Sequence, residues 1–270
     1  MSRISERACR AWYLWSATKA EHPAALFEEV IGFFDALAVP PAELRVTRSP
    51  AEVKRRKFTP RALLAAAADA DTQRVIVMSS GDVPSVEVEV YLADHKGYEE
   101  FSQHRVFKVL VHAALDAATP GWTLLTAATR HYRVVHGADL LSPGRSAAVA
   151  EVNLISNASL PPALVKRIAF DAMHVRQAHE TLRRLYPVTI IGPDIWAKLP
   201  PLPAVEPAPI VTDLGNCKVL TAWPELCDPR DPAFLRGTVA LRSWLWPHTI
   251  QNPADHVDED PYEYGQGEPP

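Results

Sequence analysis

The segment Tyr186-Pro-Val-Thr-Ile-Ile-Gly-Pro-Asp-Ile-Trp196 runs into the proline-rich Leu199-Pro-Pro-Leu-Pro203, and this order of elements is the most informative feature of the chain. The β-branched run Val188 to Ile191 predicts a short strand. Pro193 predicts the start of a short helix that ends near Leu199, because proline is favoured in the first helical turn. No catalytic motif lies inside this stretch.

A hairpin and a helix are predicted after this segment. Ile210 to Thr221 places Gly215-Asn216 between two runs with strand composition, which is typical of two antiparallel strands joined by a tight turn. Phe234 to Trp246 then predicts the last helix, and Pro247 ends it because proline cannot continue a helix.

The first part of the chain alternates strand and helix patterns. Ala8 to Ser16 is rich in aromatic residues and predicts a strand, whereas the apolar residues from His22 to Leu37 recur at helical spacing. Thr59-Pro60 predicts the start of an alanine-rich helix to about Asp69, since threonine is a favourable N-cap. The segment between these helices, Arg45 to Lys57, shows no decisive pattern.

Two strands are predicted next, at Gln73 to Ser79 and Ser85 to Tyr91. In the second, valines alternate with Glu87 and Glu89, so the two glutamates share one face of the strand. This alternation indicates an antiparallel sheet with one face in water, on which both glutamates would be exposed.

Helices and strands continue to alternate through the middle of the chain. We predict a helix from Glu99 to Ala118, strands from Trp122 to Val135 and from Ala147 to Ile155, and a long helix from Pro161 to Leu185. The predicted fold class is therefore α+β, with antiparallel sheets packed by amphipathic helices. The alternation in both parts of the chain leaves open two similar α+β halves.

Charge divides the 270 residues into a balanced body and an acidic tail. Residues 251–270 contain six acidic residues and no lysine or arginine, so the first 250 residues hold 28 basic and 26 acidic residues. We predict one α+β domain over residues 1–250 and an acidic, flexible tail over residues 251–270. A balanced body lacks the basic face of a nucleic-acid-binding protein, so no direct nucleic-acid partner is expected.

The sequence also indicates a compartment. The apolar run after Arg7 is interrupted by Arg10, so we predict no signal peptide, and no run of about twenty apolar residues could span a bilayer. Three cysteines, Cys9, Cys217 and Cys227, are too few and wrongly spaced for a disulfide framework or a thiolate zinc site. The expected location is the cytoplasm, without contact with a membrane.

Motifs for catalysis, cofactors and metals are missing from the sequence. The ten histidines include no pair at the spacing of a helical metal site, and no nucleophile elbow or phosphate-binding glycine loop occurs. Lys54-Arg55-Arg56-Lys57 is the only basic cluster; it suits a few phosphates, but a solvated loop is the simpler interpretation. We therefore predict no catalytic residue, no cofactor and no metal ligand.

Aromatic residues give the clearest hint of a binding surface. Trp12, Tyr13 and Trp15 lie in one predicted strand, where neighbours point to opposite faces. If one face is open, Trp12 or Trp15 would anchor a partner, because tryptophan is enriched at interface hot spots. If helices cover both faces, these residues belong to the core, and the sequence leaves the two possibilities open.

The two ends of the chain resemble the immunity protein 52 family of polymorphic toxin systems and related type VI secretion immunity families. The matching features are Tyr13 and Trp15 in the first strand, Tyr186-Pro187 after the long helix, Ile190-Ile-Gly-Pro-Asp194, the Leu199-to-Pro203 run, and the turn at Leu214-Gly215-Asn216. The resemblance covers residues 10–40 and 182–248. One departure is that family members often carry an arginine just after the tryptophan, whereas Ser16 to Lys19 follow it here, and lysine cannot make the same bidentate contact.

This resemblance implies a cytoplasmic immunity protein that binds a cognate toxin, typically a restriction-endonuclease-like DNase delivered by type VI secretion, by occlusion and without catalysis. Negative charge would complement the basic groove of a nuclease and speed association. Glu87 and Glu89 are candidates for that contact, as are the tail residues Asp255, Asp258, Glu259, Asp260, Tyr262 and Tyr264. A merely solubilising tail is the alternative, and self-association is left open.

Two other functions remain as alternatives at the sequence level. An enzyme of unrecognised type would gather His and Asp residues with shifted pKa values in a cleft. A secretion adaptor or chaperone would hold an effector without inhibiting it.

Overall fold

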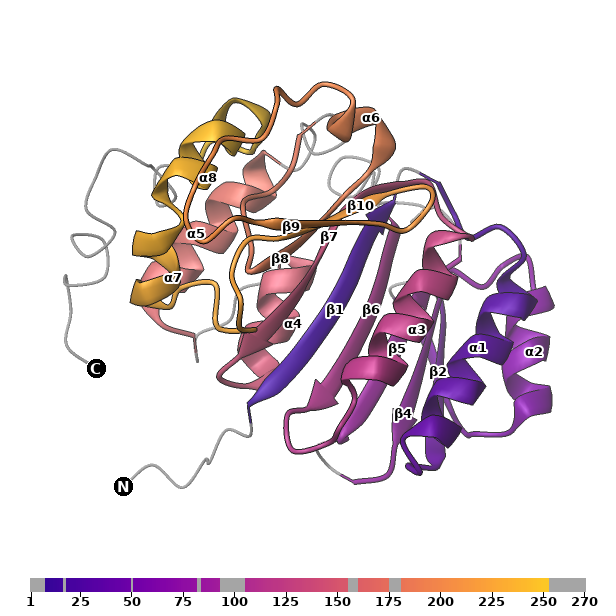
Figure 1. Cartoon of the computed structure of the whole chain (residues 1–270). Helices are drawn as coiled ribbons and strands as arrows, with labels where there is room; N and C mark the ends of the chain where they lie inside the picture. Colours follow the sequence, from indigo (N-terminus) through magenta and orange to yellow (C-terminus); the bar gives the residue numbers. More distant parts are fainter. Residues whose placement is uncertain are drawn as a thin grey trace, which may run out of the picture.

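The computed structural model describes residues 8–16, 18–49, 51–81, 84–92, 105–154, 160–174 and 181–252. These residues form ten strands in a single sheet, in the order β3-β2-β4-β5-β6-β1-β7-β8-β10-β9 (Figure 1). Every neighbouring pair is antiparallel. The predicted α+β class with an antiparallel sheet is thereby confirmed, and both parts of the chain contribute to the same sheet.

The strands of the first part of the chain are β1 (Cys9–Ser16), β2 (Pro41–Ser49), β3 (Glu52–Lys57), β4 (Arg74–Ser79), β5 (Val86–Tyr91) and β6 (Arg105–His112). The later strands are β7 (Val134–Ser142), β8 (Val188–Ile191), β9 (Ile210–Asp213) and β10 (Lys218–Thr221). The first strand in the chain thus lies in the middle of the sheet, between β6 and β7. The hairpins β2–β3 and β9–β10 form its two ends.

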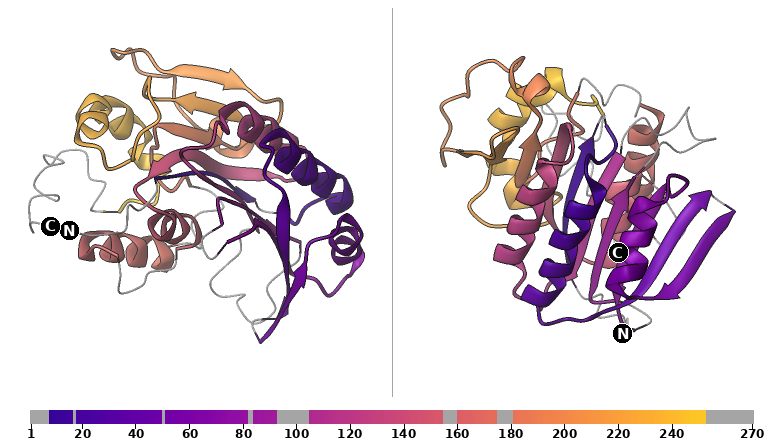
Figure 2. Two further views of the ribbon diagram at one scale, coloured as in Figure 1. Left: turned by 90° about the horizontal axis from the view of Figure 1, so that it is seen from below. Right: turned by 90° about the vertical axis from the view of Figure 1, so that its right-hand side faces the viewer.

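Helices cover both faces of the sheet (Figure 2). We call the two faces the Trp12 face and the Trp15 face, after residues of β1 that point to opposite sides. Against the Trp12 face pack α1 (Pro23–Ala36), α2 (Pro60–Ala68) and α3 (Ala118–Thr129). The Trp15 face carries α4 (Arg145–Asn153), α6 (Pro193–Trp196), α7 (Pro232–Gly237) and α8 (Val239–Leu245), and α5 (Pro162–Met173) packs on α4.

The core on the Trp12 face shows why the first predictions were correct. In α1, Leu26, Phe27, Val30, Phe33 and Phe34 form one buried stripe, as the helical spacing predicted. The Thr59 side chain accepts a hydrogen bond from the Ala62 N–H at 3.1 Å, so it caps α2 as expected. Local signals at these helix starts agree with the tertiary packing.

Predictions in the middle of the chain were wrong in three places. The segment predicted as a helix to Ala118 contains strand β6, whereas the predicted strands at Trp122 to Val135 and Ala147 to Ile155 contain helices α3 and α4. In such short apolar runs, periodicity alone does not separate a buried strand from a helix. Pro120 lies in the first turn of α3, where proline is tolerated.

Two further predictions need correction at their ends. The long helix predicted to Leu185 ends as α5 at Met173, and residues 181–187 are not helical where the structure describes them. The last helix is divided into α7 and α8, and a short 3-10 helix, Trp246–His248, follows. None of the helices in the described ranges is both long and apolar enough to cross a membrane.

The pairing of β1 with β7 requires a glycine at position 137. A Cβ atom on Gly137 would lie 2.2 Å from the Tyr13 carbonyl oxygen, which is part of the backbone and cannot rotate away. We expect Gly137→Ala to lower the free energy of unfolding by about 1–3 kcal/mol in urea denaturation, as overpacked sites do. The matched control is Gly32→Ala in α1, where nothing lies within 4 Å. This second change is expected to raise stability by about 0.5–1 kcal/mol, and equal effects of the two would contradict the argument.

Candidate functional site

The predicted aromatic anchors are core residues. Trp12 is 0% exposed and Trp15 is 2% exposed, and they pack in the cores on opposite faces of the sheet. The Arg10 guanidinium covers the Trp12 ring at 4.5 Å from its centroid and pairs with Asp139 at 2.6 Å. The expectation that one of these tryptophans is presented to a partner is therefore wrong in the folded chain, because helices cover both faces.

The predicted glutamates are buried as well. Glu87 and Glu89 do share a face of β5, as the alternation indicated, but they are 3% and 1% exposed. The prediction of a solvated face is wrong because α4 packs on the neighbouring strands β6 and β1 of the Trp15 face, and Arg145 of α4 pairs with Glu87. Neither side chain is available to a docking partner.

Both glutamates belong to an ion-pair cluster that we call the Lys108 network. The Lys108 ammonium, on the neighbouring strand β6, pairs with Glu89 and lies 3.4 Å from Glu87. Arg74 of β4 reaches Glu89 at 3.1 Å, and Arg145 of α4 pairs with Glu87. Two buried carboxylates are thus matched by three cations, an arrangement that compensates charge where water cannot.

Acid should destabilise the protein through these buried carboxylates. Burial opposes ionisation of Glu89, but the charges of Lys108 and Arg74 outweigh it and hold the pKa of Glu89 below the ordinary 4.5. The pKa of Glu151 is lowered in the same way by Arg183 and Arg184. The folded chain therefore binds fewer protons than the unfolded chain at low pH. Stability is fully present above about pH 4.5 and falls as the pH drops through the lowered pKa values.

We expect the free energy of unfolding, measured in urea at a series of pH values, to fall steeply below about pH 4.5. Glu89→Gln should flatten this acid dependence, whereas Glu225→Gln at an exposed position should leave it unchanged. An acid slope for Glu89→Gln as steep as that of the wild type would contradict the assignment.

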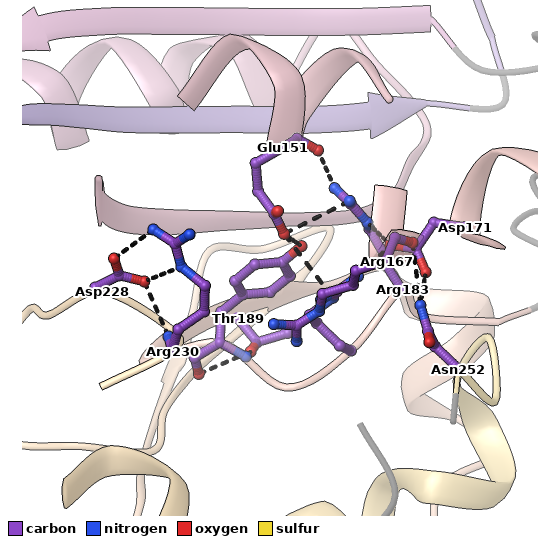
Figure 3. A network of polar contacts seen from close by, with 10 residues as sticks. Glu151, Arg167, Asp171, Arg183, Thr189, Asp228, Arg230 and Asn252 are labelled. Atoms are coloured by element: carbon purple, nitrogen blue, oxygen red, sulfur yellow. Dashed lines mark hydrogen bonds and ion pairs between the residues drawn. The ribbon is translucent and has the colours of Figure 1, made fainter. Parts of the chain in front are cut away.

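A second cluster of buried charges, which we call the Asp171 network, is shown in Figure 3. Arg183 is fully buried and donates from Nε to Asp171 at 2.6 Å, and Arg184 pairs with the same carboxylate. The Asn252 amide donates to Asp171 at 2.8 Å, and the Tyr186 hydroxyl donates to Glu151 at 3.0 Å.

This network joins segments that are distant in the chain. Glu151 is in α4, Asp171 in α5, Arg183 follows residues 175–180, and Asn252 ends the described part of the chain. Its residues do not form a sequence motif, and three of them, Glu151, Arg183 and Arg184, lay in segments whose secondary structure was predicted wrongly. Only the adjacent pair Arg183-Arg184, next to an apolar Leu182 and Leu185, hinted at buried charge.

The buried polar groups are arranged for structure. The carboxylates of both networks are bonded to arginine or lysine, which stay charged near neutral pH, so they suit ion pairing better than proton transfer. Burial raises the thiol pKa of Cys9 and Cys227 to about 11 and that of Cys217 to about 12, and all three are free cysteines. In the described ranges, no three His, Cys, Asp or Glu residues form a group that could hold a metal ion.

Three exposed features of the described surface could contact another molecule. The first is an open groove of about 500 Å³ between α1 and α3, lined among others by Glu29, Trp122 and Arg130. The others are the edge strands β3 and β9, each of which pairs with a neighbour on one side only. In β3 the five residues from Val53 to Lys57 are exposed, and in β9 all four residues are exposed.

The remaining predicted contacts lie outside the described residues. These are the tail residues Asp255, Asp258, Glu259, Asp260, Tyr262 and Tyr264, together with most of the predicted tail segment. Their proposed role therefore stays a prediction from the sequence.

Comparison with known proteins gives a similarity of fold. No protein-family model matches the chain, and no curated protein sequence matches it. Among solved structures, the chain is similar to the Pseudomonas aeruginosa T6SS protein PA0821, with a TM-score of 0.54 and 12% sequence identity. The match covers 90% of this chain and 73% of that chain. At this identity the comparison establishes a shared architecture, and the resemblance to the immunity protein 52 family stays a prediction.

Proposed function

We propose that this protein is an immunity protein of a type VI secretion system. It binds a cognate effector, a restriction-endonuclease-like DNase, in the cytoplasm and neutralises it by occlusion, without catalysing a reaction. The observation that carries the proposal is the fold shared over 90% of the chain with a protein whose name assigns it to the T6SS. The sequence resemblance at both ends of the chain points in the same direction.

The distribution of polar groups supports binding over turnover. The carboxylates of the Lys108 and Asp171 networks are buried and paired with cations, and neither network contributes a residue to the open groove. What a partner meets is the exterior: the groove and the two edge strands. A stable inhibitory complex would bury about 1,600 Å² in total.

Co-expression with the neighbouring effector gene tests the proposal. Cells that produce the effector's nuclease domain should lose viability and genomic DNA, and the full-length chain should restore both. With purified proteins, DNase activity should fall linearly with added chain and reach zero near one equivalent, because an occluding inhibitor acts stoichiometrically.

Other outcomes would identify other functions. If the chain co-purifies with the effector and the cells still die, it is an adaptor or chaperone. If a substoichiometric amount abolishes DNase activity in a time-dependent way, the chain is an enzyme that modifies the effector. Equal killing with no co-purification would refute any role toward that effector.

A further inference from the structure

The β3 edge leaves a row of backbone groups open. The Phe58 N–H donates to the Ala42 carbonyl, and the antiparallel register then continues through Leu44 opposite Arg56. Because hydrogen-bonded and non-hydrogen-bonded positions alternate along such a pair, the backbone groups of Lys54 and Arg56 face β2. Those of Val53, Arg55 and Lys57 face outward, where an added strand could pair with them.

Positive charge surrounds this open edge. Lys54, Arg55, Arg56 and Lys57 are consecutive and exposed, and Arg61 of α2 is exposed nearby in sequence. Lys54 pairs with Glu52 at 2.8 Å. Arg55, Arg56, Lys57 and Arg61 form no ion pair with any carboxylate among the residues that the structure describes.

The register also places two like charges opposite each other. Arg55 lies directly opposite Arg45 of β2, at a position that is not hydrogen-bonded, where cross-strand side chains are closest. Like charges in such positions destabilise a sheet. Glu43 pairs with Arg45 at 2.5 Å and offsets only part of this charge.

The two other exposed features lack such a preference. Glu29 and Arg130 bring one charge of each sign to the groove between α1 and α3. In β9, Asp213 is already paired with Lys218, and the strand has only four residues. Neither feature therefore favours a partner whose charge is mainly of one sign.

We propose that the β3 edge binds an extended acidic segment of the cognate effector, which adds as an eleventh strand beside β3 in the sheet of the described residues. This inference rests on the proposed function and names one contact of that complex. Backbone hydrogen bonds to Val53, Arg55 and Lys57 would hold the segment, as in other strand additions. Acidic side chains on its two faces would meet Arg55 and Lys57 on one side and Lys54 and Arg56 on the other.

A protein segment fits this edge better than nucleic acid or a second copy of the edge. The basic cluster is one strand wide in an otherwise balanced body, whereas nucleic-acid binders carry a broader basic face. Pairing of two β3 edges would oppose four consecutive cations to four others, which repulsion disfavours.

Two variants of the full-length chain separate charge from backbone pairing. Arg55→Glu/Lys57→Glu reverses the charge, with Lys166→Glu/Lys198→Glu, at exposed lysines elsewhere, as the control with the same change in net charge. Val53→Pro removes one outward N–H without changing charge, and proline is tolerated at such an edge position. Circular dichroism and urea denaturation should show that all variants remain folded.

Binding is measured by surface plasmon resonance against the effector and against a synthetic peptide of alternating Glu and Val. We expect the charge-reversed variant to lose at least about tenfold in affinity for both, mainly through slower association at low salt. Val53→Pro should weaken both interactions, and the control should leave both unchanged. A Trp122→Ala variant in the groove should bind like the wild type.

The other possible results distinguish a failure of the edge inference from a failure of the proposed function. If the charge-reversed variant binds and neutralises the effector like the wild type, the edge inference is wrong and the proposed function stands. If the wild type does not bind the effector but binds the acidic peptide, and the charge-reversed variant does not, the β3 edge prefers acidic segments and the proposed function is wrong. Edge-dependent binding of a single-stranded oligonucleotide, or self-association lost in the variant, would overturn the inference in favour of those partners.

Discussion

Arg183→Met is expected to lower the free energy of unfolding by about 3–5 kcal/mol, because it leaves buried carboxylates without their main cation. Arg183 is 0% exposed, its Nε donates to Asp171 at 2.6 Å, and another of its nitrogens lies 3.5 Å from Glu151. Methionine fills a similar volume, so the loss of stability reflects the removed charge more than a change in packing. Urea denaturation at pH 7 measures it.

A double-mutant cycle makes this first expectation specific. Adding Glu151→Gln removes one of the stranded charges, so the double variant should be less destabilised than the sum of the two single variants. Lys166→Met, at an exposed position of α5, should change stability by no more than about 0.5 kcal/mol. Strict additivity in the cycle would show that Arg183 and Glu151 do not act together.

Lys108→Met should have an effect of similar size in the Lys108 network. The Lys108 side chain is 2% exposed, and its ammonium group pairs with both Glu87 and Glu89, which are buried on the adjacent strand β5. Its removal leaves Glu87 with Arg145 and Glu89 with Arg74, so each carboxylate keeps one cation and loses the one they share. We expect a loss of about 3–5 kcal/mol in urea denaturation at pH 7.

The matched control for this change is Lys218→Met in β10. Lys218 also pairs with a carboxylate, Asp213, but its side chain is 30% exposed and that of Asp213 is 58% exposed. An exposed pair contributes no more than about 1 kcal/mol, since water already solvates both charges. Equal losses for the two lysine variants would mean that burial does not determine the strength of the Lys108 network.

Both predictions assign the strongest ion pairs of the described residues to the interior of the protein. If they hold, the charged residues available for recognition are those on the exterior, above all the basic residues of β3. The buried glutamates would then act on function only through the stability of the fold. If the proposed immunity function is correct, its loss in a Glu89 variant should follow the loss of folded protein.

Helix starts and alternating strands were predictable because their signals are local. Thr59 caps α2 through its own side chain, the apolar stripe of α1 repeats at helical spacing, and the turn at Gly215 joins two short strands. The α+β class follows from such elements. Each depends on residues a few positions apart, which the sequence displays directly.

The candidate site was not predictable in the same way. Alternation placed Glu87 and Glu89 on one face of β5, but burial of that face depends on α4, which is about sixty residues further along the chain. Lys54 to Lys57 gave no decisive pattern, because their meaning depends on β3 being the last strand of the sheet. The sequence by itself determined which segments can form strands and helices with one apolar side. Only the tertiary structure decided which faces are covered and which strand remains an edge, because burial and pairing are set by partners that the chain brings from far away in sequence.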